Sequence, residues 1–268
     1  MNKLTSNELR NLHPSELRGL VRDNSFAIQT GGSYRGFVQT NIVILPAEYA
    51  QDFKRYCQLN PKPCPLLATG EPGNPKLPEL GSDIDIRTDV PAFNIFEGGE
   101  LVNTVFDIKE YWQDDFVTFA LGCSYSFEEA LEDVGLEVRH NRLGLVSPMY
   151  TTNIETKSVG PFFGPTVVTM RPFSSSDVDR VIQVTSRFPK VHGAPIHIGN
   201  PNEIGIEDLA KTEFGGNAVP VNDNEVPVFW ACGVTPQLAV ANAQLPICIT
   251  HKPAFMLVTD RTNAEFTL

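Results

Sequence analysis

A cysteine and two serines stand at the start of a predicted helix near the middle of the chain. Residues 122–129 read GCSYSFEE, in which Ser126 and Glu129 have the spacing of a capping box. Free backbone N–H groups at a helix start bind carboxylates and can lower the pKa of a thiol. The competing interpretation is a capped helix with a buried cysteine. On the chemical interpretation, Cys123 and Ser124 are candidate catalytic residues, and Ser126 is a candidate substrate-binding residue.

A second cysteine stands at a similar junction further along the chain. The stretch 226–231 is rich in β-forming residues, Cys232 and Gly233 then make a turn, and Thr235 can cap a short helix. Glycine also lets another group approach the backbone closely. This pattern is typical of a pocket floor, although a structural turn whose Trp230 fills the core fits nearly as well. Cys232, Gly233 and Thr235 are therefore further site candidates.

Two histidines five residues apart are candidates for proton transfer. His192 and His197 would point to opposite faces of a strand over 193–199, so a shared metal ion would need a bend in the chain. Either imidazole could act as a general acid or base. A hydrogen-bonded structural role fits these histidines equally well.

Acidic and apolar residues alternate over 82–89, which reads SDIDIRTD. A strand here would place Asp83, Asp85 and Arg87 on one face and two isoleucines on the other. Such a polar face could hold a hard cation or present arginine to a substrate carboxylate. A solvated ladder of ion pairs is the more common outcome.

The elements that must position these residues read as an α/β pattern. A capping box over 5–8 and apolar spacing after Pro14 predict short helices at the start, 97–100 predicts a hairpin turn, and 116–122 fits a strand or a helix. Strands are predicted over 36–45, 82–89, 166–170, 193–199, 226–231, 247–250 and 254–259, and helices over 47–59, 126–135, 174–185 and 235–243. The succession over 226–250 predicts a parallel strand–helix–strand unit.

Composition limits the class of protein. The chain has 268 residues, of which 41% are hydrophobic and 20% are charged, as in a folded globular protein. A formal net charge of −11 disfavours nucleic acid and anionic membrane surfaces as partners. The sequence has no long apolar run, its first residues lack a secretory pattern, and its five irregularly spaced cysteines indicate reduced thiols. We therefore expect a cytoplasmic protein. Phosphate-loop, dinucleotide-binding, hydrolase-elbow and zincin motifs are absent from the sequence.

Eight segments spread over nearly the whole chain resemble the bacterial hydro-lyases related to the D-glutamate cyclase of mitochondria. The chain departs from the family's pattern at Ser147, where a valine is expected before Pro148, and at Ala254, where glycine is usual. The matching segments are QTNIVILP (39–46), NPKPCPLL (60–67), DIDIRT (83–88), GCSYSFE (122–128), PMY (148–150), MRP (170–172), HGAPIHIG (192–199) and PVFWACGVTPQ (227–237).

The resemblance implies an α/β fold, which we expect as a mixed sheet with flanking helices in two intimately joined lobes. We place the main lobe in 1–115 and 200–268 and a second, smaller lobe in 116–199. The resemblance also implies a lyase that eliminates water from a small amino or hydroxy acid. In the related cyclase this reaction interconverts D-glutamate with 5-oxo-D-proline and water.

The roles of individual residues follow from motif position and chemistry. Closing glutamate into a lactam needs a group that binds the α-carboxylate, a group that transfers protons, and donors that stabilise the developing oxyanion. We assign these tasks, in that order, to Arg87 or Arg171, to His192 or His197, and to the turns around Cys123–Ser124 and Cys232–Gly233–Thr235. Covalent acyl transfer through Cys123 is a less favoured route.

Two other functions stay open. A non-catalytic protein could bind a small carboxylate or amino acid with the same helix ends and arginines. A metal-dependent hydro-lyase could use Asp83, Asp85 and a histidine. We expect no cofactor but leave a divalent metal open, and we expect a small-molecule carboxylate as the ligand, with a homo-oligomer also open.

Overall fold

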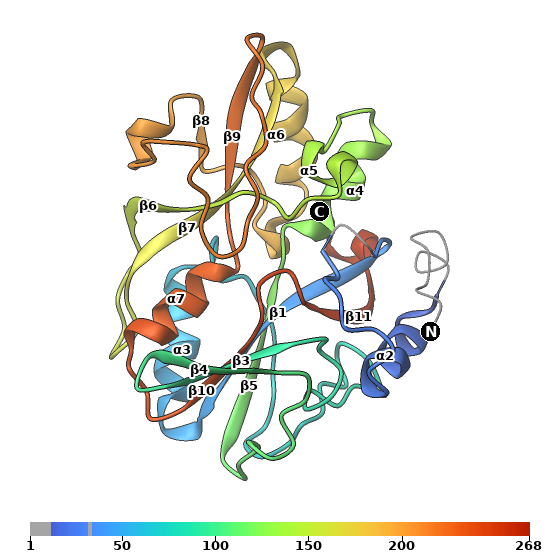
Figure 1. The fold of residues 1–268 in the computed structure, drawn as a ribbon, viewed down its shortest axis with the longest axis vertical. Coiled ribbons are helices and arrows are strands. Elements are labelled where there is room, and N and C mark those ends of the chain that lie inside the picture. Colours follow the sequence, from blue (N-terminus) through green and yellow to red (C-terminus); the bar gives the residue numbers. More distant parts are fainter. Residues whose placement is uncertain (1–11, 32–33) are drawn as a thin grey trace.

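The computed structural model describes residues 12–31 and 34–268. Within these ranges the strands form one sheet of seven strands and one of four, and each named strand pair is antiparallel. Figure 1 shows the four-stranded sheet above the seven-stranded sheet, with helices packed beside both. The capping box predicted over 5–8 lies outside the described residues.

The large sheet is built around one long central strand. Its order is β2 (Leu66–Thr69), β5 (Phe116–Gly122), β1 (Phe37–Pro46), β10 (Cys248–His251), β3 (Phe93–Glu97) and β4 (Glu100–Val105), and β11 (Leu257–Thr262) also pairs with β1. The small sheet has the order β6 (Met149–Glu155), β7 (Pro165–Ser174), β9 (Glu225–Ala231) and β8 (His197–Ile198).

Helices cover both sheets. The α-helices are α2 (Pro14–Arg22), α3 (Ala47–Leu59), α4 (Tyr125–Asp133), α5 (Arg139–Leu143), α6 (Val178–Ser186) and α7 (Val234–Asn242). The 3₁₀ turns are η1 (Ser175–Asp177), η2 (Pro189–Val191), η3 (Pro201–Ile204) and η4 (Asn263–Phe266). None of the helices in the described part of the chain combines the length and the apolar character needed to cross a membrane.

Apolar periodicity explains which faces pack together. On one face of the large sheet, Val43 of β1 packs with Phe53 of α3 and Val240 of α7. On the other face the loop preceding β3 supplies Ile84 and Ile86. In the small sheet, a separate cluster joins helices α4 and α6 to β9. The predicted strand over 36–45 and helix over 47–59 are confirmed because each presents a continuous apolar surface to these cores.

The expected α/β fold with flanking helices is confirmed, but the predicted parallel unit over 226–250 is wrong. Strand β9 lies in the small sheet and β10 in the large sheet, so helix α7 carries the chain from one sheet to the other. Sheet membership therefore changes after Gly122 and after Ala231. The lobe boundaries placed between 115 and 116 and between 199 and 200 stay predictions.

The strand predicted over 82–89 is also wrong. The segment forms successive turns, in which the Asp89 carboxylate accepts from the Asp85 N–H at 2.9 Å and the Asp85 carboxylate accepts from the Arg87 N–H at 3.1 Å. Aspartate side chains that bond to nearby backbone compete with a sheet ladder. The isoleucines are buried as the alternation predicts, but the backbone between them does not form a strand.

The second predicted capping box has another role. Helix α4 forms as predicted, but the Ser126 hydroxyl accepts from the Gln39 N–H at 3.1 Å and the Glu129 carboxylate accepts from the Gly36 N–H at 2.9 Å. Both side chains therefore tie α4 to the chain around the start of β1. The strand predicted over 193–199 is shorter than expected, because only His197 and Ile198 pair with β9.

Candidate active site

Two strand-to-helix turns, one from each sheet, meet at a single buried cavity. Strand β5 leads through Cys123 and Ser124 into α4, and β9 leads through Cys232 into α7. Both cysteines and Ser124 line the same space, which we call the inner cavity. The sequence predicts each turn as a separate candidate, and the structure brings them together.

Asn41 of β1 joins the two turns. Its side-chain amide donates to the Gly122 carbonyl at 2.8 Å. A Cβ atom on Gly233 would lie 2.0 Å from the same amide nitrogen, so glycine is needed for this close approach. Asn41 was not among the sequence-predicted site residues, although it lies in one of the segments that resemble the family.

The inner cavity is small and has several polar groups in its wall. Its volume is about 20 Å³, which is room for roughly one water molecule. The polar side chains other than the thiols that line it belong to Asn41, Ser124, Tyr125, Ser147, Thr169 and His251. Ser147 is buried and its hydroxyl has no protein partner among the described residues. A buried hydroxyl in this position is suited to binding a water molecule.

Arg171 orients two of these hydroxyls from behind the cavity wall. Its guanidinium donates to Thr169 Oγ1 at 2.9 Å and to Ser124 Oγ at 3.1 Å. Because arginine can only donate, each hydroxyl keeps its own hydrogen free for another acceptor. Arg171 is fully buried and is not part of the cavity wall, so it acts on the cavity through Ser124 and Thr169.

A buried carboxylate balances the charge of Arg171. Glu128 Oε1 accepts from Arg171 Nε at 2.8 Å and lies 3.1 Å from His140 Nε2. Burial raises the pKa of Glu128, but His140 and Arg171 outweigh burial and lower the pKa to about 2. The guanidinium carbon of Arg171 also lies 5.2 Å from the centre of the Phe127 ring.

His251 is the histidine that lines the inner cavity, and sequence reasoning missed it. Its Nδ1 lies 3.1 Å from the Ile42 N–H and 3.4 Å from the Ile42 carbonyl. The Ile42 N–H can only donate, so Nδ1 accepts from it and the neutral ring carries its proton on Nε2, which lies 3.2 Å from the side-chain nitrogen of Gln237. Burial lowers the pKa of His251 to about 4. A neutral imidazole can donate a hydrogen bond to a substrate oxygen.

The cysteines line the cavity as neutral thiols. Burial raises the pKa of Cys123 to about 12 and that of Cys232 to about 11. Neither side chain is a thiolate at neutral pH, and the thiolate is the nucleophilic form. The helix starts nearby do not overcome the cost of burying a charged sulfur. Covalent transfer through Cys123 therefore gains no support from this geometry.

The two predicted histidines lie outside the inner cavity. His192 is buried beside Gly122, where its Nδ1 donates to the Lys62 carbonyl at 2.8 Å and its Nε2 has no partner among the described residues. His197 is on β8, and its Nε2 lies 2.8 Å from the Asn200 carbonyl. Neither ring lines the cavity, so their proposed roles in proton transfer stay predictions.

The buried His192 predicts a loss of stability in mild acid. Burial lowers the pKa of His192 to about 4, so between pH 6.5 and 4 the unfolded chain binds a proton that the folded chain does not. We expect this residue to remove about 2 kcal/mol of unfolding free energy between pH 7 and pH 5. Urea unfolding of wild type and His192→Asn at both pH values measures this loss. An equal loss in the two proteins would contradict the prediction.

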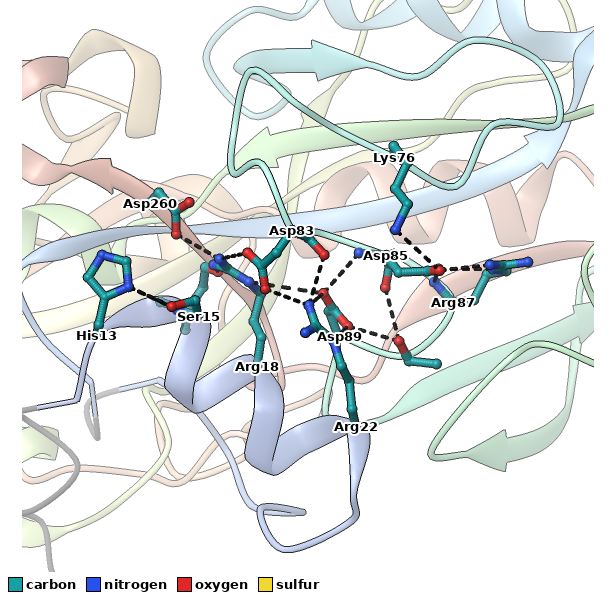
Figure 2. Close-up of polar contacts among 12 residues, drawn as sticks. His13, Ser15, Arg18, Arg22, Lys76, Asp83, Asp85, Arg87, Asp89 and Asp260 are labelled. Atoms are coloured by element: carbon teal, nitrogen blue, oxygen red, sulfur yellow. Dashed lines mark hydrogen bonds and ion pairs between the residues drawn. The ribbon is translucent and has the colours of Figure 1, made fainter.

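The predicted substrate-binding residues of 82–89 belong to an ion-pair network beside α2, shown in Figure 2. Arg18 and Arg22 both pair with Asp83, and Arg87 donates to Asp85 at 2.9 and 2.7 Å. None of these side chains lines the inner cavity. In the described part of the chain, no group of three or more His, Cys, Asp or Glu side chains is arranged to hold a metal ion.

The remaining predicted residues support the turns. Ser126 bonds to the β1 backbone, Gly233 makes room for Asn41, and Thr235 Oγ1 accepts from the Val167 N–H at 2.9 Å. Thr235 therefore links the start of α7 to β7 by a hydrogen bond, and it does not line the inner cavity. Its role in binding substrate stays a prediction, as do those of Ser126 and Gly233.

A larger, open space adjoins the inner cavity. This outer cleft has a volume of about 350 Å³, in the usual range of small-molecule sites. It shares Val234 and Pro253 with the wall of the inner cavity. Gln237 lines the cleft, and its amide nitrogen lies 2.9 Å from Nδ1 of His251. The inner cavity and the outer cleft therefore share part of their walls, and His251 lies next to the place where they meet.

Comparisons with known proteins identify the family. A family model described as D-glutamate cyclase matches residues 117–260. A Bradyrhizobium diazoefficiens protein named "Putative hydro-lyase" is 56% identical over 234 residues, covering 87% of this chain and 86% of the relative. One of the same name from Paraburkholderia phymatum is 53% identical over 255 residues, covering 95% of this chain and 99% of the relative. A solved nitrogen repressor-like protein from Methanococcus jannaschii has a TM-score of only 0.37 at 10% identity, with 95% and 99% of the two chains covered.

The chain therefore belongs to the D-glutamate cyclase family. The resemblance read from its motifs is confirmed, and so is the expectation, at the level of the family, of an enzyme of the hydro-lyase class, a carbon–oxygen lyase.

Proposed function

We propose that this hydro-lyase closes D-glutamate to 5-oxo-D-proline and water. The observation that carries the proposal is the pairing of a water-sized polar cavity with a substrate-sized cleft. The outer cleft has room for an amino acid, and the inner cavity has room for about one water molecule. We place the substrate in the cleft, with its γ-carboxyl group turned towards the inner cavity.

The groups around the cavity suit this reaction. The α-amine nitrogen attacks the γ-carboxyl carbon, and one carboxylate oxygen leaves as water with the two protons that the α-ammonium group gives up in all. We assign His251 Nε2–H and the Ser124 hydroxyl as hydrogen-bond donors to the carboxyl oxygens. Ser147 would hold the departing water. Because the attack is intramolecular, the protein mainly has to orient the glutamate side chain and transfer protons.

Lys252 is the residue that we assign to the α-carboxylate. It supplies the positive charge among the described residues that line the outer cleft, and its backbone N–H is fixed by the Ala92 carbonyl at 2.9 Å. We expect Lys252→Met to raise KM roughly tenfold, because one charge-assisted hydrogen bond is lost. Arg87→Met is the matched control, since Arg87 pairs with Asp85 elsewhere, and its KM should stay within about twofold. Equal KM values for the two variants would refute the assignment.

Proton NMR of the purified protein tests the reaction itself. The protein is incubated separately with D-glutamate, L-glutamate and each enantiomer of 5-oxoproline. Selective interconversion of D-glutamate and 5-oxo-D-proline supports the proposal. No conversion of any of the four compounds, with and without added divalent metals, rejects this substrate class and directs the search to hydroxy acids.

The proposal uses no cofactor and takes a small carboxylate as ligand in a cytoplasmic enzyme, with the oligomeric state left open. Turnover that survives chelation supports the metal-free route, and turnover that is lost on chelation and restored by a divalent ion overturns it. The alternative of a non-catalytic binder predicts saturable binding of D-glutamate without product. The family membership favours the enzyme, because the relatives are named as hydro-lyases.

A further inference from the structure

The outer cleft has more apolar wall than free glutamate can cover. Glutamate has no apolar group larger than its two methylene carbons, yet most of the cleft is lined by apolar side chains. These belong to Phe96 and Leu101 of the β3–β4 hairpin, to Leu238 and Ala241 of α7, and to Phe214. A site for free glutamate alone needs few of these contacts, because apolar walls stabilise apolar ligand surface.

Phe214 is held in an unusual backbone conformation at this wall. Its φ of 53° is in the left-handed region, which bulky residues rarely adopt. Flanking hydrogen bonds fix the loop: the Glu213 N–H donates to the Met149 carbonyl at 2.9 Å, and the Asn217 N–H donates to the Val146 carbonyl at 3.1 Å. Backbone conformations of this kind persist where the surroundings enforce them, and they are frequent at binding sites.

The ring of Phe214 marks the boundary between the two spaces. It packs with Cys232 and Val234, which line the inner cavity, and it also faces the outer cleft. The polar wall of the inner cavity and the apolar wall of the cleft therefore meet at this ring. A ligand that satisfies both walls has a polar reacting end and an apolar group at its other end.

We propose that the substrate is a D-glutamyl compound in which the α-carboxyl group is linked by an amide bond to an apolar residue. This inference rests on the proposed function. The amine and the γ-carboxyl group remain free and react as in glutamate, so the new C–N bond again forms with loss of one water molecule. The product is the corresponding 5-oxo-D-prolyl amide. The apolar side chain occupies the cleft between Leu101 and Phe214, and the carboxylate of that residue takes the place beside Lys252 that the α-carboxylate of glutamate would have.

Two dipeptides that carry the same charges test the inference. Isothermal titration calorimetry compares D-glutamyl-leucine with D-glutamyl-serine, and we expect the leucine compound to bind at least tenfold more tightly, because burying a leucine side chain is worth about that factor or more. Leu101→Trp should fill the cleft and bring the ratio of the two Kd values near one. Val102→Trp is the control, because Val102 is the next residue of the same strand, is as exposed as Leu101 and does not line the cleft.

The outcomes separate this inference from the proposed function. Equal affinities for the two dipeptides in wild type overturn the inference, even when D-glutamate is converted. A tenfold preference that Leu101→Trp leaves unchanged also overturns it, because the apolar group then binds elsewhere. NMR of the same samples reports turnover. Selective binding that Leu101→Trp removes, without any product, supports the inference about the ligand and rejects the proposed reaction.

Discussion

Replacement of His251 by asparagine should reduce kcat by about 10²- to 10³-fold, the range typical of a lost hydrogen-bond donor to a developing oxyanion. Asparagine can still accept the Ile42 N–H through its side-chain oxygen, as Nδ1 does at 3.1 Å in the wild type. It cannot place a donor where the imidazole carries Nε2–H. The variant therefore keeps the local support and loses the ring nitrogen that we assign as a donor to the substrate. Steady-state kinetics with D-glutamate measures the loss.

His197→Asn provides the matched control. His197 lies on β8, bonds to the Asn200 carbonyl and does not line the inner cavity, so its replacement should leave kcat within about threefold. Thermal unfolding of both variants shows whether each remains folded. A His251→Asn protein that is folded and fully active would remove His251 from the mechanism. A large loss in His197→Asn instead would return proton transfer to the strand that the sequence favoured.

The sequence predicted the local elements well where one apolar period dominates. Helix α3 matches its predicted range because the face bearing Phe53 repeats at helical spacing and packs on β1. The prediction over 82–89 was wrong because alternation predicts which side chains are buried, but it does not reveal that the Asp85 and Asp89 carboxylates bind backbone N–H groups that a strand would need. Local pattern therefore identified burial more reliably than strand formation.

The site was predicted in part, because its pieces come from distant segments. The turns at Cys123 and Cys232 were each recognised from a strand followed by a helix start. Their meeting depends on α7 crossing between the sheets, which no local pattern encodes. His251 was missed because it ends a short strand without any motif of its own. Its ring is oriented by the hydrogen bond from the Ile42 N–H of β1, a contact between distant segments that the sequence does not reveal.

The sequence identifies Arg171 as a candidate site residue, but it does not show that the charge of Arg171 is buried against a carboxylate of the protein. In the sequence it is an arginine at the end of an apolar strand, which suggests a ligand for a substrate carboxylate. In the structure Glu128 already occupies that position, and it comes from a helix 43 residues away along the chain. The other N–H groups of the guanidinium donate to Ser124 and Thr169 instead of to a substrate.

Arg171→Met should be the most destabilising substitution at the site, at about 3–5 kcal/mol of unfolding free energy. It leaves the Glu128 carboxylate buried with His140 and the Asn141 amide as its remaining partners, and a buried charge that has lost its ion-pair partner costs about this much. The double variant Arg171→Met, Glu128→Met removes both charges and should recover much of the loss. Urea unfolding of the two variants at pH 7 checks this, and a double variant no more stable than the single one would show that packing, rather than charge, is responsible.

The same pair predicts how wild type responds to strong acid. The pKa of Glu128 is about 2 in the folded protein, against an ordinary value of 4.5. Stability from this carboxylate is therefore complete above pH 4.5 and is lost as the pH falls from about 4.5 towards 2, by about 3 kcal/mol in all. The double variant should lack this part of the acid dependence, so its unfolding free energy should fall less steeply over that interval. If both proteins lose stability at the same rate, Glu128 is not held charged by Arg171 and His140.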